Sequence, residues 1–124
     1  MIKVLVSTDP RYPVNRKVLR RAVLGVFEKE KINDISAEVS VAVVGRRKMK
    51  DLTSKYLGDG KVHEVLSFPI EGKGPDEVLR LGDVVLSWPE VLLAAARDNV
   101  MVDEEVEKLV VHGVEHLLGR HHEE

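Results

Sequence analysis

The sequence predicts one small domain of mixed α/β (α+β) class, a mixed sheet of about four strands flanked by about four helices. Its 124 residues are enough for one ordinary domain. With 44% hydrophobic and 32% charged residues, the composition is that of a globular protein. Helical and strand-like segments alternate, with connections of both hairpin and crossover length. No repeat, low-complexity tract or linker divides the chain, so the predicted domain spans residues 1–124.

Four apolar or β-branched segments predict strands. The first follows Met1, and the second, ISAEVSVAVV, alternates in part between apolar and polar residues. The third, HEVLSFPI, is stopped at Pro69, and the fourth is LGDVVLSW. The predicted strands are residues 2–6, 35–44, 63–70 and 81–88.

Two predicted helices belong to the first half of the chain. Beyond Pro13, apolar residues recur every three to four positions as far as Phe27, which is the spacing of one buried helical face. A very basic segment, residues 46–56, follows Gly45 and is broken by the Gly-Asp-Gly run at 58–60.

Two more helices are predicted in the second half. Pro89 suits the first turn of a helix over residues 89–98, with Ser87 as its candidate cap. The last helix is predicted to begin near Asp103, where acidic residues suit the positive end of the helix dipole. Gly119 is predicted to end it as a C-terminal cap residue.

Charge is distributed unevenly although the net charge is only −2. Residues 1–62 hold 14 Lys and Arg against 7 Asp and Glu, whereas residues 63–124 hold 5 against 14. All five histidines belong to the acidic half, and four of them fall within the last thirteen residues. This asymmetry predicts a basic face that binds an anionic partner and a second region with a different function. The alternative is that the chain simply has two solvated faces of opposite charge.

Several classes of protein are disfavoured by composition. No apolar run approaches the roughly 20 residues that span a bilayer, so no membrane association is expected. The N-terminus has the pattern of a first strand rather than of a signal peptide. Without cysteine the chain forms no disulfide, and a metal site must use His, Asp or Glu. A cytoplasmic location is expected.

The C-terminal histidines have the spacing of a metal site. His112 and His116 are one helical turn apart and can converge on one ion. Gly119 allows a sharp turn of the backbone, after which His122 can supply a third nitrogen. Zinc accepts three histidines and keeps a fourth position for water, so the pattern predicts one catalytic Zn²⁺ per chain. A histidine-rich surface end without a ligand role is the alternative. His121 is expected to be solvated or to support a ligand.

The pattern H-G-x-x-H-x-x-G-x-x-H also has the ligand spacing of the metzincin peptidases. Gly113 stands where those enzymes carry their general-base glutamate, and Glu115 points away from the histidine edge. A metallopeptidase is therefore disfavoured. His63 is expected to be a strand residue rather than a fourth ligand.

Three motifs together resemble the YbeY-type endoribonucleases, the bacterial rRNA maturation factors. They are HEVLSFP at 63–69, LGDVVLSWPEV at 81–91 and HGVEHLLGRHH from residue 112, and the resemblance covers roughly residues 40–123. It implies a zinc ion held by His112, His116 and His122, through which these residues act in catalysis. It also implies a single-strand-specific endoribonuclease in rRNA maturation and ribosome quality control. The implied partners are ribosomal RNA, the small ribosomal subunit and an assembly GTPase.

One departure from the family pattern bears on activity. The family usually has an arginine after the tyrosine that precedes the VLSFP strand, where this chain has Leu57 after Tyr56. Lys55, Lys61 or Arg120 are candidates to replace that phosphate contact. Leu57 favours an alternative function, a non-catalytic ribosome-assembly or RNA-binding factor in which the metal is structural.

Basic residues around the second predicted helix are the candidate RNA contacts, because lysine and arginine neutralise phosphates. With 4% aromatic residues, little base stacking is expected, and Phe27, Phe68 and Trp88 are expected in the core. Asp83 is a candidate partner for a ligand imidazole or a turn cap. The predicted RNA contacts are Arg46, Arg47, Lys50, Lys55 and Lys61, with Lys48 in the same basic segment.

Overall fold

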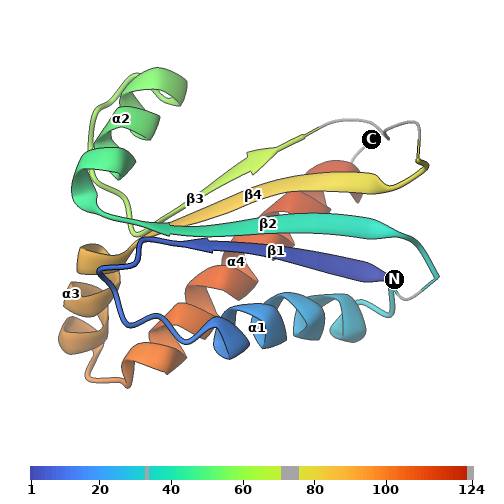
Figure 1. The fold of residues 1–124 in the computed structure, drawn as a ribbon, viewed down its shortest axis with the longest axis horizontal. Helices are drawn as coiled ribbons and strands as arrows, with labels where there is room; N and C mark the ends of the chain where they lie inside the picture. Colours follow the sequence, from blue (N-terminus) through green and yellow to red (C-terminus); the bar gives the residue numbers. More distant parts are fainter. Residues whose placement is uncertain (33, 71–75, 123–124) are drawn as a thin grey trace.

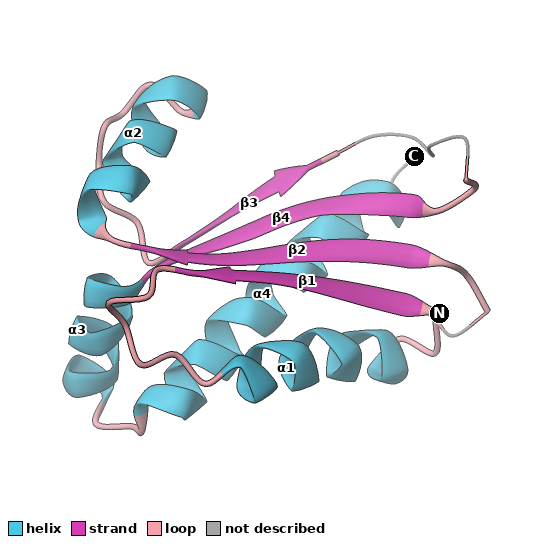
Figure 2. Ribbon diagram, in the orientation of Figure 1, coloured by secondary structure: helices cyan, strands magenta, loops and turns pink. Residues whose placement is uncertain are grey.

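The computed structural model describes residues 1–32, 34–70 and 76–122, with side chains as far as residue 119. It confirms the mixed α/β class, with four strands and four helices in the described chain (Figure 1). The strands form one sheet in the order β1-β2-β4-β3, in which only β3 runs antiparallel to its neighbour (Figure 2). The elements are β1 (Ile2–Thr8), α1 (Arg16–Lys29), β2 (Ala37–Val44), α2 (Arg46–Tyr56), β3 (Val65–Pro69), β4 (Leu79–Ser87), α3 (Trp88–Asp98) and α4 (Val102–His122).

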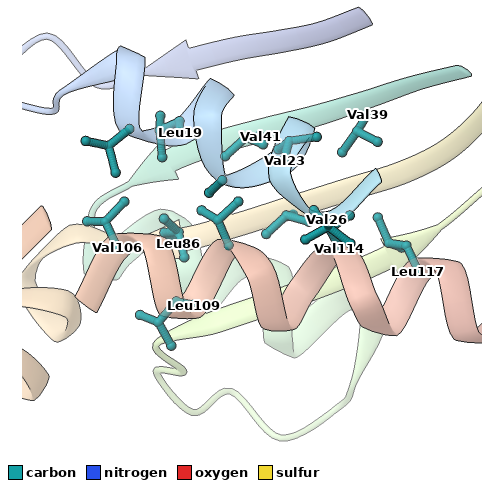
Figure 3. Packing of buried hydrophobic residues seen from close by; sticks show 14 of the residues in the cluster. Leu19, Val23, Val26, Val39, Val41, Leu86, Val106, Leu109, Val114 and Leu117 are labelled. Carbon is teal, nitrogen blue, oxygen red and sulfur yellow. The ribbon is translucent and has the colours of Figure 1, made fainter. Parts of the chain in front are cut away.

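One face of the sheet, here called the covered face, is packed under α1 and α4. Strand β2 shows the cause, because its residues alternate between fully buried and half-buried positions along the whole strand. Val39 and Val41 point into a core that also receives Val23 of α1 and Val114 of α4 (Figure 3). Complete burial of each such side chain contributes about 1.5–3 kcal/mol to the free energy of unfolding. Phe27 and Trp88 are buried here, as predicted.

The opposite face, here called the open face, is covered at one end only. Helix α2 places Met49 against Leu66 and Val85, which forms a second and smaller cluster. Ala42 of β2 packs against this cluster but remains half-buried, as does Ser40 on the same strand. In Figures 1 and 2, α2 lies across the sheet from α1 and α4, so the two faces carry very unequal helical cover.

Helix ends follow local chemistry in most places. The side chain of Asn15 caps α1, with Oδ1 accepting from the backbone N–H of Lys17 at 3.1 Å. Asn99 takes the left-handed conformation that ends α3, with φ of 56°. Ser87 occupies the predicted N-cap position of α3, but its hydroxyl makes no capping hydrogen bond. Its Oγ is buried and has no hydrogen-bond partner among the described atoms.

Helix α4 continues past the predicted stop at Gly119 and reaches His122. A glycine inside a helix costs only about 0.5–1 kcal/mol relative to alanine, whereas burial of Leu117 and Leu118 holds the preceding turn onto the sheet. Packing therefore outweighs the local stop signal. No helix in the described ranges is long and apolar enough to cross a membrane.

Strand bounds differ from the predicted ones by two residues at several ends. His63 consequently precedes β3 instead of belonging to it. In β4, Gly82 takes φ of +141°, and a Cβ there would lie 2.2 Å from the carbonyl oxygen of Phe68. The pairing with β2 shifts register next to this glycine, so the irregularity is built into the strand.

Candidate functional site

His112 and His116 lie one turn apart on α4, and both are exposed. Glu107 and Glu115 form ion pairs with Arg21 and Lys29, so one flank of α4 faces α1. Glu107 and His116 are nine residues apart, and at about 100° per residue this spacing puts them on opposite sides of the helix. His116 therefore lies on the flank away from Glu107, the flank toward the β3 edge of the sheet.

Gly113 fixes the distance between this part of α4 and the sheet. A Cβ at this position would lie 2.7 Å from Cγ1 of Val84 and 3.1 Å from Oγ of Ser67. The Ser67 hydroxyl donates to the Gly113 carbonyl at 3.2 Å, which ties α4 to β3 directly after His112. A glutamate at residue 113 does not fit this contact. The glycine in the histidine motif thus has a packing cause.

The third predicted ligand, His122, is reached by the helical backbone, but its side chain lies outside the described residues, as do the side chains of Arg120 and His121. In a continuous helix, residue 122 lies about 240° round the axis from His116. The described residues contain no group of three His, Asp or Glu side chains that could hold a metal ion. The zinc site with three histidines therefore stays a prediction, and it requires α4 to end at Gly119.

His63 has a partner away from α4. Its Nε2 lies 3.0 Å from Oδ2 of Asp59. The pKa of Asp59 is lowered, first by the backbone N–H of Lys61, which donates to Oδ1 at 2.9 Å, and next by His63. These contacts order the connection between α2 and β3.

Asp83 is not placed to support a ligand histidine, nor does it cap a turn. It lies within β4 on the open face, since its neighbour Val84 packs against Gly113 of α4 on the covered face. Partial burial raises the pKa of the Asp83 carboxyl, and a hydrogen bond from Ser40 opposes that rise. The sequence signal that could have placed Asp83 on the open face is the alternation of side chains along LGDVVLS, because Asp83 and Val84 must point to opposite faces of the sheet.

The predicted RNA contacts belong to α2 and the segment after it, across the sheet from the histidines. Arg46 and Arg47 line a cavity of about 660 Å³ beside the C-terminal ends of β1 and β2. The first turn of α2 contains no acidic residue, and Gly45 provides no side-chain cap. Arg46 also pairs with Glu90, its Nε lying 2.6 Å from Oε1. The arrangement suits an anion at this helix N-terminus.

The remaining predicted cations are exposed. Lys50 projects from α2, and Lys61 lies in the connection that leads to β3. Lys55 holds its Nζ 5.2 Å from the centre of the Tyr56 ring. Leu57, just past the end of α2, is 53% exposed.

A groove of about 490 Å³ adjoins α2 on the open face, and no sequence pattern predicted it. Tyr56 and Phe68 form one wall, with ring centres 5.1 Å apart and planes tilted by 55°. Phe68 packs against the smaller cluster of Met49, Leu66 and Val85 but is only half-buried, because the open face lacks a second helix. The groove residues are Ser40, Ala42, Leu52, Tyr56, Phe68, Pro69, Ile70, Asp83 and Val85.

Edge strand β3 separates the two regions. Ser67 points to α4, while the next residue, Phe68, lines the groove on the open face. Consecutive residues of β3 thus face the helix that carries the histidines and the groove, on opposite sides of the sheet.

Comparison with known proteins identifies relatives along most of the chain. The family model described as endoribonuclease YbeY matches residues 8–124. A protein of Persephonella marina named endoribonuclease YbeY is 34% identical over 111 residues, which are 89% of this chain and 71% of that protein. The protein of the same name from Thermodesulfovibrio yellowstonii is 39% identical over 85 residues, which are 68% of this chain and 54% of the relative.

The solved structures give the same fold. The solution structure of TM1509 from Thermotoga maritima matches with a TM-score of 0.60 at 24% identity, over 94% of this chain and 71% of that one. This likeness concerns the fold alone. With the match of the family model to nearly the whole sequence and the relatives above 30% identity, the chain belongs to the endoribonuclease YbeY family.

Proposed function

We propose that this chain is a zinc-dependent, single-strand-specific endoribonuclease that acts in ribosomal RNA maturation and ribosome quality control in the cytoplasm. The observation that carries the proposal is the exposed pair His112 and His116, one turn apart on the β3 flank of α4, in a chain of the YbeY family. Its partners would be ribosomal RNA, the small ribosomal subunit and an assembly GTPase.

His112 and His116 fit a zinc ion by donor type, since imidazole nitrogens are preferred zinc ligands and both side chains are exposed. The hydrogen bond from Ser67 to Gly113 holds the backbone between them against β3, which limits movement of the pair. A bound zinc ion would supply a water of lowered pKa and a Lewis acid for a phosphoryl oxygen.

Gly119 supports the third ligand. Among the described residues, no atom outside the adjoining helical backbone would lie within 4 Å of a Cβ at Gly119, in contrast to Gly113, so packing against the described chain does not require this glycine. Its remaining distinction is backbone freedom. We infer that the last turn of α4 unwinds at Gly119 when metal binds and brings His122 to the pair, because metal binding can order a chain end.

The basic surface of α2 would hold the RNA backbone. Arg46 and Arg47 meet phosphate at the uncapped helix N-terminus, while Lys50, Lys55 and Lys61 neutralise further phosphates. Strand β3 lies between this surface and the histidines, so the substrate would cross that edge. A flexible single strand can make this turn more readily than a stiff duplex, which supports single-strand specificity.

The proposal is tested with a fluorescent single-stranded RNA and three protein samples: zinc-loaded, chelated, and His116→Ala. Cleavage is expected only in the first. His63→Ala is the matched control, because His63 pairs with Asp59 outside the site, and it should keep both metal and activity. Equal cleavage by all samples would show that the histidines do not supply the activity.

Leu57 favours a second candidate, a non-catalytic assembly factor in which the metal is structural. Its exposed side chain stands where the family usually has an arginine, and arginine at such a place stabilises charge on phosphate. In that case chelation lowers the melting temperature and the metal-loaded chain binds RNA without turnover. Leu57→Arg distinguishes the candidates: cleavage that appears only in this variant supports the assembly factor, and cleavage by the unaltered chain rejects it.

A further inference from the structure

We propose that the groove between α2 and β3 binds one guanine base of single-stranded RNA, with Tyr56 against the base and Asp83 accepting hydrogen bonds from its Watson–Crick edge. The inference rests on the proposed RNA-directed function but concerns a separate region, on the other face of the sheet from His112 and His116. It adds base recognition to a surface for which the sequence predicts phosphate contacts alone.

The size and lining of the groove suit a flat heterocycle. Its volume of about 490 Å³ is within the range of small-molecule sites, and its residues are mostly apolar with two polar groups that converge. Tyr56 is 56% exposed although it contacts Phe68, so much of this aromatic side chain is open to a ligand. Aromatic side chains of this kind stack on bases that a single strand can turn outward.

The polar groups select the ligand. Asp83 is half-buried and lies directly opposite Ser40 in the pairing of β2 with β4. An ionised carboxylate has about four acceptor positions and no donor, so capacity for a ligand's N–H groups remains. The Watson–Crick edge of guanine presents two adjacent donors, N1–H and the N2 amine, which match the two carboxylate oxygens. Uracil presents a single N–H there, flanked by two carbonyl acceptors that a carboxylate repels.

The charges around the groove argue for a nucleotide over an apolar peptide. An apolar side chain over Asp83 would bury the carboxylate without a new hydrogen bond, which is unfavourable. A phosphate at the same position would meet a like charge. A nucleotide satisfies both conditions, because its neutral base can face Asp83 while its phosphate remains at the rim near Lys55, whose Nζ lies 5.2 Å from the Tyr56 ring centre.

The position of β3 connects this groove to the histidine flank. Ser67 and Phe68 are consecutive residues on opposite faces of the edge strand. A single strand that crosses this edge can place one base in the groove and a neighbouring phosphate near α4. The groove would therefore select where along the RNA the strand is presented.

The test measures binding apart from cleavage. In the full chain carrying His116→Ala, fluorescence anisotropy gives the Kd for four uracil nonamers whose central base is G, A, C or U. The G oligonucleotide is expected to bind about 5- to 100-fold more tightly than the U oligonucleotide, the range for one bidentate contact to a base. Asp83→Asn should remove most of this preference, and Tyr56→Ala should weaken binding of the G oligonucleotide by about fivefold or more.

Matched controls keep the result specific. Leu93→Ala removes a side chain with 55% exposure on α3, outside the groove, and Asp34→Asn removes an exposed carboxylate elsewhere; both should leave the four Kd values unchanged. Circular dichroism confirms that each variant is folded. Equal Kd values for the four oligonucleotides, or a G preference that survives Asp83→Asn, would overturn the inference.

Further outcomes distinguish this inference from the proposed enzyme activity and from dimer formation through the groove. If the unaltered chain cleaves RNA but shows no G preference, the inference fails while the proposed enzyme stands. If the G preference is present and depends on Asp83 but no cleavage occurs, the groove is confirmed and the enzyme is rejected. A sedimentation change from dimer to monomer in Tyr56→Ala, with unchanged RNA binding, would assign the groove to a second copy of this chain and overturn the inference.

Discussion

The covered and open faces of the sheet differ in how their residues are used. On the covered face, α1 and α4 bury a continuous apolar core that extends along the whole of β2. On the open face, α2 buries three residues at one end, and the rest of the sheet is left with a groove and half-buried polar side chains. Stability therefore comes mainly from the first face, and the second has room for a ligand.

Strand β3 belongs to both faces, which explains why a small domain can combine the two roles. Leu66 and Phe68 face α2, and Ser67 faces α4. Because β3 is an edge strand, an RNA strand can pass round it from one face of the sheet to the other. We expect substitutions on the covered face to change the free energy of unfolding and those on the open face to change binding.

The largest expected effect is Leu117→Ala on the covered face. Leu117 is completely buried, so its truncation should lower the free energy of unfolding by about 2–5 kcal/mol. Leu5→Ala on the open face is the matched control, since Leu5 is 40% exposed, and it should change stability by less than about 0.5 kcal/mol. Urea unfolding of both variants measures the contrast. Similar losses would show that the two faces contribute alike.

Gly113→Ala should have the next largest effect. The added methyl group lies 2.7 Å from Val84 and must displace α4 from the sheet, which should cost about 1–3 kcal/mol. Gly119→Ala places a methyl group where no neighbouring element of the described chain lies within 4 Å, and it should stabilise α4 by about 0.5–1 kcal/mol. Thermal unfolding measures both changes.

The same glycine pair tests the metal proposal. If the last turn of α4 unwinds at Gly119 when zinc binds, Gly119→Ala should weaken zinc affinity while it raises the melting temperature of the metal-free chain. Titration calorimetry with zinc measures the affinity. Unchanged affinity would contradict the unwinding of that turn.

Arg46→Ala should change stability little and RNA binding more. Arg46 is exposed and its ion pair with Glu90 contributes at most about 1 kcal/mol. Loss of one phosphate contact should reduce the slope of log Kd against log salt by about 1. Lys31→Ala, at an exposed site beyond the end of α1, should leave the slope unchanged. An unchanged slope in Arg46→Ala would remove this residue from the RNA surface.

Asp83→Asn should give the smallest change in stability, and the size of the change depends on pH. Burial raises the pKa of Asp83 above its ordinary value of 3.8, so the folded chain binds more protons than the unfolded chain in the window above that value. The free energy of unfolding therefore falls as pH rises through this window. The variant should gain stability relative to the unaltered chain between pH 3 and pH 7, measured by urea unfolding at both. The opposite trend would show that a hydrogen bond to the carboxylate outweighs its burial.

The sequence by itself determined the fold class, the eight elements and the histidine pair. Periodicity records which side of an element meets the core, and the apolar side of β2 and the turn spacing of His112 and His116 are both local properties. The resemblance found in the three motifs was confirmed by the family match.

Only the tertiary structure decided which faces these residues occupy and what lies across the sheet from them. Glycine is typical of helix C-terminal caps, yet α4 continues past Gly119 because Leu117 and Leu118 are buried beside it. Asp83 was a candidate partner for a ligand histidine or a turn cap, but it lies in the groove on the open face, since the face of β4 is set by its pairing with β2 and β3. Tyr56, Phe68 and Asp83 come from three elements, and strand order, which no local pattern contains, brings them together.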